Sequence, residues 1–246
     1  MNGERKTSPW VYVGIGCAVI VVLGIAGLGT LGFFGYRWAK EVESEMKDPA
    51  RREAKVKAVL GCERIPDGYH PMVSLSIPLF MDMAMLSDQP PREGGEVRGF
   101  DHRGFIYFQM LNPRFDERGV RDYFEGKTDD ASVLRRNGIN VDVHSKEMLG
   151  RGVLEMDGHA ILYLAQRGGL HLDHGATEGI NAMMLVDCPD DARMRMAIWF
   201  GPDPDPSARA GSEELRGTPA DEGTLRAFMG HFRLCGARST PAGPSR

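Results

Sequence analysis

The feature that most constrains this chain is an apolar run near its start, from Trp10 to Phe34, which contains no charged residue. Since a helix rises about 1.5 Å per residue, the run would be about 37 Å long, more than the ~30 Å hydrocarbon core of a bilayer. We therefore predict a transmembrane helix at residues 10–35, after a short tail at residues 1–9. The run is too long for a cleaved signal peptide, so we expect it to be retained as a signal-anchor.

Residues beside and within this run bear on orientation and association. Lys and Arg residues near its two ends nearly balance in number. Because large domains are translocated whatever their charge, we favour a single-pass protein whose C-terminal domain lies on the extracytoplasmic side of the membrane. One helix face carries small residues, which predict a homodimer through close helix approach: Gly14, Ala18, Ala26 and Thr30. The membrane itself and a protein at the membrane are the other expected partners.

The chain as a whole has the composition of an ordinary globular protein. Hydrophobic residues make up 42% and charged residues 26%, which excludes the disordered and collagen-like classes. The formal net charge is −4 and no basic stripe is present, so we expect no nucleic acid as a partner. About 200 residues follow the apolar run, which is enough for one sizeable core.

Local patterns predict the order of helices and strands. Asp48 before Pro49 is typical of a helix start and Gly61 of a helix end, so we expect a juxtamembrane helix within residues 36–61. Alternating or continuous apolar positions predict strands, with Asp157-Gly158 as a hairpin turn. The expected strands are 73–77, 81–85, 104–111, 139–143, 153–156, 160–165, 180–187 and 194–200, and a short helix is expected at 116–125.

The C-terminal part completes the expected fold. A loop at residues 201–217 precedes a helix that begins at Thr218 in a capping-box arrangement and stops at Gly236. Hairpin-connected strands with helices at both ends predict the α+β class. The expected architecture is an N-terminal transmembrane helix followed by one domain, residues 62–236, with an antiparallel sheet covered by helices. Residues 237–246 have the composition of a disordered tail.

The order of these elements resembles the PsbP-like α/β/α sandwich. The resemblance covers residues 65–235 and includes no diagnostic motif. It rests on Pro66-Asp67-Gly68-Tyr69 before the strands, the aromatic strand Phe105–Phe108, the Asp157-Gly158 hairpin, two late strands, and Phe228 and Phe232 in the last helix. Members of that family are mostly small binding or assembly-assisting domains. The resemblance therefore implies a binding role and transfers no catalytic residue.

Four cysteines are spread along the chain: Cys17, Cys62, Cys188 and Cys235. No CxxC spacing indicates redox or zinc chemistry. For the three that follow the apolar run we favour unpaired, buried core residues. If one pair forms a disulfide, we expect Cys188 with Cys235, because they end a predicted strand and the last predicted helix.

The strongest candidate for a chemical site is His171-Leu172-Asp173-His174, in a glycine-rich loop. Histidine and carboxylate side chains are suitable ligands for Zn²⁺. The set of His171, Asp173 and His174 is incomplete, so the fold would have to supply His159 or His144 as a further ligand. A solvated polar loop is the competing interpretation of the same residues.

Motifs for other chemistry fail on spacing. The segments Gly126-Lys127-Thr128 and Gly150-Arg151-Gly152 lack the glycines that phosphate and dinucleotide loops require, and no serine lies in a GxSxG elbow. We expect no cofactor. The sequence leaves open whether the chain is an enzyme, and favours a membrane-held binding or interaction domain without catalysis. The alternative is a metal-dependent hydrolase that uses His171, Asp173 and His174.

Overall fold

A computed structural model describes residues 48–77, 80–91, 100, 102–111, 115–137, 139, 142–172, 175–189 and 191–236, without the side chains of 142–144, 170–172 and 175–177. All of them belong to one unit of the chain, Met46–Arg246. Several predictions lie outside the described residues: the tail at 1–9, the transmembrane helix at 10–35, the small-residue stripe of Gly14, Ala18, Ala26 and Thr30, and the tail at 237–246.

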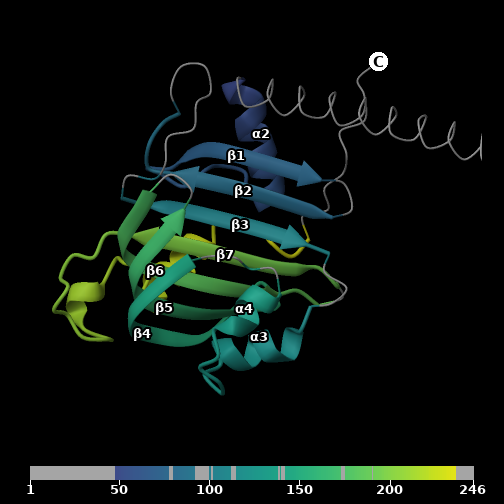
Figure 1. The fold of residues 1–246 in the computed structure, drawn as a ribbon. Helices are drawn as coiled ribbons and strands as arrows, with labels where there is room; N and C mark the ends of the chain where they lie inside the picture. The colour runs from purple at the N-terminus through teal and green to yellow at the C-terminus, as the bar shows by residue number, and fades with distance from the viewer. Residues whose placement is uncertain are drawn as a thin grey trace, which may run out of the picture. The chain divides into compact units, whose positions relative to one another are not determined.

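In the described part of the chain, seven strands form one sheet in which every neighbouring pair is antiparallel (Figure 1). Its order is β1-β2-β3-β7-β6-β5-β4, so β1 and β4 are the edges. Every residue of the central strand β7 is buried. The strands are β1 (His70–Ile77), β2 (Met81–Ser87), β3 (Gly104–Met110), β4 (Asp142–Met156), β5 (His159–Leu172), β6 (Gly175–Asp187) and β7 (Met194–Gly201).

Each face of the sheet has its own core, because successive side chains of a strand point to opposite faces. On the face behind the sheet in Figure 1, Ala197 and Trp199 of β7 pack with α2 (Pro49–Leu60) and α5 (Glu222–Met229). On the opposite face, Met196 and Ile198 pack with α3 (Glu117–Phe124) and α4 (Ser132–Arg136). We call these the α2/α5 face and the α3/α4 face.

The capping signals at the first described helix are confirmed. The carboxylate of Asp48 accepts hydrogen bonds from the backbone N–H groups of Ala50 and Arg51, and Pro49 is the first helical residue. Gly61 ends α2 in the left-handed conformation, at φ 62°. Val56 and Leu60 are fully buried on the α2/α5 face. The helix is therefore fixed by both of its caps and by one apolar side.

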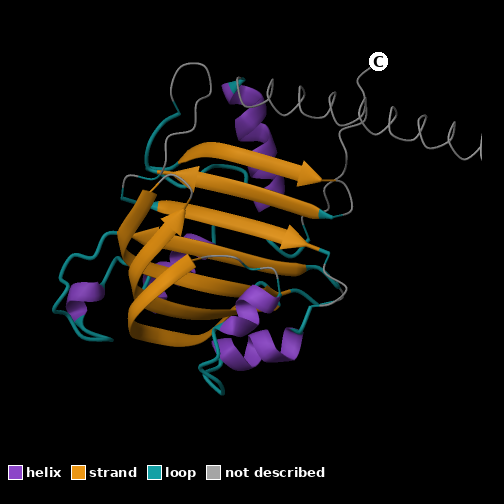
Figure 2. Cartoon of the chain, in the orientation of Figure 1, coloured by secondary structure: helices purple, strands orange, loops and turns teal. Residues whose placement is uncertain are grey.

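The predicted fold class is wrong. Strands dominate the described residues, and the helices are short, the longest having 12 residues and covering only parts of the sheet (Figure 2). No helix in the described segments is both long enough and apolar enough to cross a membrane. The structure thus corrects the predicted helix-covered α+β sheet to a mainly β domain, whereas the transmembrane helix predicted at residues 10–35 lies outside the described residues.

Two strands are longer than the sequence indicates. The segments expected as separate strands near 139–143 and 153–156 belong to one strand, β4, whose register shifts between Ser145 and Glu147 and again between Met148 and Gly150. The glycine-rich segment expected as a loop continues β5 to Leu172. Both extensions are stabilised by backbone pairing, since β5 pairs with β4 on one side and with β6 on the other.

The last helix is shorter than predicted. It begins after Asp221, whose carboxylate accepts a hydrogen bond from the backbone N–H of Thr224, and its C-cap is Gly230. The hydroxyl group of Thr218, the expected cap, instead donates a hydrogen bond to the backbone oxygen of Leu215. The residues after Gly230 continue without regular helix, and they form part of the site described next.

Candidate functional site

A cavity of about 640 Å³ opens on the α2/α5 face, where the chain turns from β4 into β5. Three segments line it. They are the residues after α2 (Gly61, Glu63, Arg64), the hairpin (Asp157, His159), and the residues after α5 (Gly230, His231, Arg233, Cys235). The cavity is therefore bounded by the C-terminal ends of two helices and by one strand end.

His159 is the buried polar residue of this cavity. Asp157 and Gly158 both have positive φ, 48° and 79°, which suits a two-residue hairpin turn and starts β5 at His159. Strand alternation places His159 on the same face as Ile161. Its side chain is 7% exposed, and its Nδ1 has no hydrogen-bond partner among the described residues. A buried polar atom without a partner costs about 1–3 kcal/mol, so a bound group or water is expected to satisfy it.

The wall from α2 depends on a glycine. A Cβ atom added to Gly61 would lie 2.5 Å from the backbone oxygen of Arg233, so the two segments approach as closely as backbones can. The backbone N–H of Arg233 also donates to the oxygen of Leu60 at 3.2 Å. This junction brings Glu63 and Arg64 to the cavity beside Arg233.

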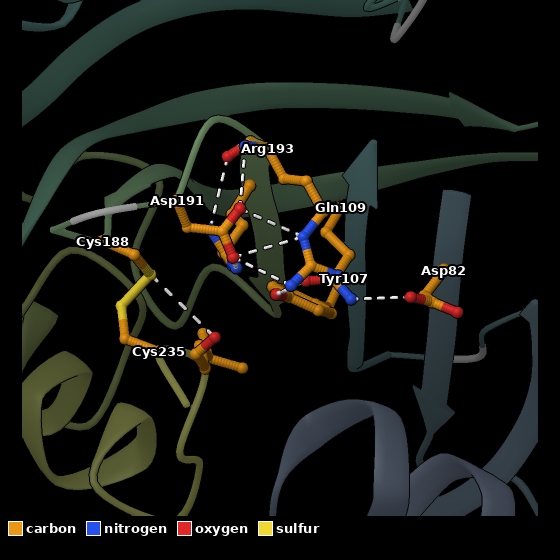
Figure 3. Close-up of polar contacts among 9 residues, drawn as sticks. Asp82, Tyr107, Gln109, Cys188, Asp191, Arg193 and Cys235 are labelled. Carbon is orange, nitrogen blue, oxygen red and sulfur yellow. Dashed lines mark hydrogen bonds and ion pairs between the residues drawn. A yellow bond between two sulfur atoms is a disulfide. The ribbon is translucent and has the colours of Figure 1, made fainter. Parts of the chain in front are cut away.

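The wall from α5 is held by an aromatic contact and a disulfide. Phe232 stacks on Phe105 of β3, with ring centroids 4.8 Å apart and planes 4° from parallel. Cys235 forms a disulfide with Cys188 at the end of β6, and the Cα atoms are 5.4 Å apart (Figure 3). The pair that we named as the alternative is thus confirmed, and the favoured interpretation of unpaired cysteines holds only for Cys62, which is free and buried.

The charged residues of the cavity carry both signs. Arg64 and Arg233 contribute two guanidinium groups, and Glu63 and Asp157 contribute two carboxylates. The closest approach between them is 3.9 Å, from Arg233 Nη2 to Glu63 Oε1, and those side chains are 77% and 91% exposed. An ion pair so exposed contributes little to stability. The charges are therefore available to a ligand.

Beyond the disulfide, a second polar cluster lies at the same end of the sheet (Figure 3). Asp191, in the turn between β6 and β7, accepts hydrogen bonds from Arg193, 2.8 Å from Nη2, and from Arg195, which is 2% exposed. The hydrogen bond from Arg193, and to a smaller extent the one from Arg195, holds the pKa of Asp191 well below its ordinary value. Gln109 Nε2 donates to Asp82 Oδ2 at 2.7 Å and links the cluster to β2.

The contacts of these groups indicate a structural role rather than a catalytic one. The carboxylate of Asp191 is already neutralised by two guanidinium groups, and the pKa of Tyr107 is raised because the hydroxyl is buried. Arg195 Nε is buried without a partner in the described residues, and a neighbouring cavity of about 80 Å³ has room for water. The cluster fixes the β6–β7 turn on the sheet.

Cys62 carries a free thiol, and its two neighbours in the sequence, Gly61 and Glu63, line the cavity. Burial raises its pKa, so the thiol stays protonated near neutral pH. Since the thiolate is the reactive form, Cys62 is not activated as a nucleophile.

The predicted metal site falls largely outside the described residues. The backbone of His171 lies in β5, but its side chain, Asp173 and His174 are not described. The register pairs His144 of β4 with Gly169 of β5, which is near His171. His159 lies at the other end of β5, about 40 Å from His171 along the strand. His159 therefore cannot complete that set, and no group of three metal-ligating side chains occurs among the described residues. The site at His171, Asp173 and His174 stays a prediction.

The sequence predicted His159 only as a possible metal ligand and Asp157 only as part of a hairpin turn, and it indicated no role for Glu63, Arg64 or Arg233. The signal that could have singled out His159 is its place directly after the hairpin turn, on the apolar face of a predicted strand. Nothing in the sequence shows that residues 61–64 and 230–235 meet.

Comparison with known proteins gives no relative: no protein-family profile, no curated protein sequence and no solved structure matches the chain. The resemblance to the PsbP-like sandwich therefore stays a prediction.

Proposed function

We propose that this chain is a binding domain, without catalysis of its own, that holds a small ligand in the cavity around His159. The observation that carries the proposal is the buried imidazole whose Nδ1 has no partner among the described residues, in a cavity of about 640 Å³. Cavities of 300–1,000 Å³ with a few placed polar groups are typical of small-molecule sites. The three lining segments are held by the end of α2, by the β4–β5 hairpin and by the disulfide of Cys235, which suits a preformed site.

The titratable groups beside the cavity support binding over catalysis. Reactive groups in enzymes have pKa values shifted toward the form that reacts. Here burial raises the pKa of the Cys62 thiol, so the thiol keeps its proton. The most strongly shifted carboxylate, Asp191, is held by two arginines in the neighbouring cluster and is not free to accept a proton.

The disulfide supports the expected extracytoplasmic location of the domain. Stable disulfides form in oxidising compartments and are rare in the cytosol. Cys188 and Cys235 join the end of β6 to the cavity wall, so the site as described requires the oxidised form. We therefore propose that this domain works outside the cytosol.

The test uses the full-length chain and four named probes: inorganic phosphate, succinate, putrescine and trialanine. We expect at least one of them to raise the melting temperature with increasing concentration, because a ligand that binds only the folded state stabilises it. His159→Phe, which fills the cavity, should abolish that rise. Proton NMR after overnight incubation should show the probe unchanged.

Two further variants keep this test interpretable. Arg64→Glu changes an exposed charge of the cavity without touching the core, and should alter the response to the same probe even if His159→Phe folds poorly. Arg209→Ala, at an exposed position outside the cavity, is the matched control and should respond as the wild-type chain does. The proposal fails if no probe shifts the wild-type melting temperature, if both cavity variants keep the full shift, or if the probe is consumed.

A further inference from the structure

The chemistry of the cavity points to a class of ligand, and this inference rests on the function proposed above. Within the described residues, some opposite charges elsewhere are tightly paired. Arg167 Nε lies 2.5 Å from Asp203, and Arg121 lies 2.5 Å from Asp187. The cavity differs, since its two guanidinium groups and two carboxylates come no closer than 3.9 Å.

The cationic groups of the cavity are free to bind a carboxylate. Arg64 forms no ion pair or side-chain hydrogen bond with the described residues, and Arg233 has only the long, exposed contact with Glu63. Both arginines follow the C-terminal end of a helix by a few residues. A guanidinium group suits a carboxylate because its planar donors match the two oxygens.

The anionic side is built from two carboxylates and two helix ends. Asp157 makes no ion pair or side-chain hydrogen bond with any described residue, and Glu63 has only its contact with Arg233. The C-cap residues of α2 and α5, Gly61 and Gly230, both line the cavity. The C-terminal end of a helix carries partial negative charge, which favours a cation such as an ammonium group.

His159 adds an uncharged hydrogen-bonding group to these charges. A neutral imidazole has one donor and one acceptor nitrogen, so it can bind an uncharged amide. The ring lies deeper than the charged residues, which are exposed, whereas His159 is buried. The cavity of small-molecule size therefore combines two guanidinium groups, two carboxylates and one group that can bind an amide.

We infer that the cavity binds a short zwitterionic peptide with a free ammonium and a free carboxylate. The carboxylate contacts Arg64 and Arg233, and the ammonium contacts Glu63, Asp157 and the helix ends. His159 hydrogen-bonds a peptide group between them. A single amino acid shares the charged ends of such a ligand and lacks the peptide group.

Calorimetric titration of the full-length chain tests this inference with trialanine, its N-acetyl form, its C-terminal amide, the doubly capped form, and alanine. Trialanine should bind most tightly. Each cap should weaken binding by up to about fivefold, because it removes one ion pair with exposed side chains of the cavity. Alanine should bind more weakly than trialanine, since it cannot reach His159 and both charged sides at once.

Matched variants assign the two ends. Arg64→Ala with Arg233→Ala should remove the preference for the free carboxylate over the amide and keep the preference for the free ammonium. Glu63→Gln with Asp157→Asn should do the reverse. Arg209→Ala and Glu214→Gln, which change exposed charges outside the cavity, should leave both preferences intact.

The outcomes separate this inference from the proposed function. If succinate or putrescine binds as tightly as trialanine and His159→Phe abolishes that binding, the cavity is a ligand site but the zwitterion is the wrong class. If capped and free peptides bind equally, the charged ends play no part and the inference is likewise wrong. If no probe binds the wild-type chain, both the inference and the proposed function fail.

Discussion

Trp199 Nε1 donates a hydrogen bond of 2.7 Å to the hydroxyl oxygen of Tyr69, so the central strand β7 is joined to the residue that precedes the edge strand β1. Both side chains are almost fully buried, at 6% and 9% exposure. Phe228 of α5 contacts both rings, with centroids 4.2 Å from Trp199 and 5.4 Å from Tyr69. This aromatic group fixes α5 on the sheet and therefore positions the segment that forms the cavity wall.

Replacement of Tyr69 by Phe tests this junction. The change keeps the ring and removes the acceptor, which leaves a buried indole N–H without its partner and should cost about 1–3 kcal/mol in the free energy of unfolding. Urea denaturation measures the loss. Replacement of Tyr123, a half-buried tyrosine on the α3/α4 face, by Phe is the control and should cost less. Equal stability of Tyr69→Phe and wild type would show that the hydrogen bond is not formed.

Gly61→Ala should destabilise the domain more than Gly158→Ala does. Both glycines have positive φ, at 62° and 79°, so both substitutions incur the left-handed penalty of about 1–2 kcal/mol. Only at Gly61 would the new Cβ meet the backbone oxygen of Arg233, whereas nothing lies within 4 Å at Gly158. Thermal denaturation of the two variants compares them directly, and equal losses would contradict the close approach of α2 to the C-terminal wall.

Removal of the disulfide should lower stability and open the cavity. The bond closes a loop of 47 residues, for which the chain-entropy model gives about 4 kcal/mol. We expect Cys188→Ala with Cys235→Ala to reduce the free energy of unfolding by about that amount and to weaken ligand binding, because Cys235 lines the cavity. Cys62→Ala is the control, since it leaves the disulfide in place. A double variant that binds trialanine as the wild type does would exclude a role of the disulfide in shaping the site.

Asp191 should make the free energy of unfolding depend on pH in the acidic range. Its folded-state pKa lies below the unfolded value of about 3.9, so its contribution to stability is complete above about pH 4 and is lost as the pH falls through the folded pKa. Asp191→Asn also leaves the buried Arg195 without its carboxylate. It should cost about 2 kcal/mol at pH 7, less than for a fully buried pair because Asp191 is 27% exposed.

Urea midpoints measured from pH 7 to pH 2 check this expectation. The difference between wild type and Asp191→Asn should shrink below pH 4, while Glu214→Gln, at an exposed position, should show no comparable trend. A constant difference across the range would mean that the carboxylate of Asp191 does not carry the effect.

Local signals in the sequence predicted several elements correctly because the physics that fixes them is local. Asp48, Pro49 and Gly61 define α2 through capping and backbone conformation, and the Asp157-Gly158 turn follows from the preference for positive φ. The aromatic strand at Gly104–Met110 was recognisable because both of its faces are apolar, as a central strand requires.

The errors lie where long-range contacts override local preference. Glycines are poor strand formers, so the glycine-rich end of β5 and the start of β6 were expected as loop. In the structure, a Cβ at Gly179 would lie 2.2 Å from the backbone oxygen of Gly201, so the close approach of β7 requires glycine there. Likewise, the wall at Arg233 depends on a contact with Gly61, which no local pattern encodes.

The most direct test of the account follows the imidazole of His159 by NMR while trialanine is added to the full-length chain. The signal is assigned by its absence from His159→Phe. We predict that it shifts and saturates with the same dissociation constant as calorimetry gives, and that the Arg64→Ala, Arg233→Ala variant needs more peptide for the same shift. An unchanged His159 signal at concentrations where calorimetry reports saturation would place the ligand elsewhere and contradict the assignment of this cavity as the binding site.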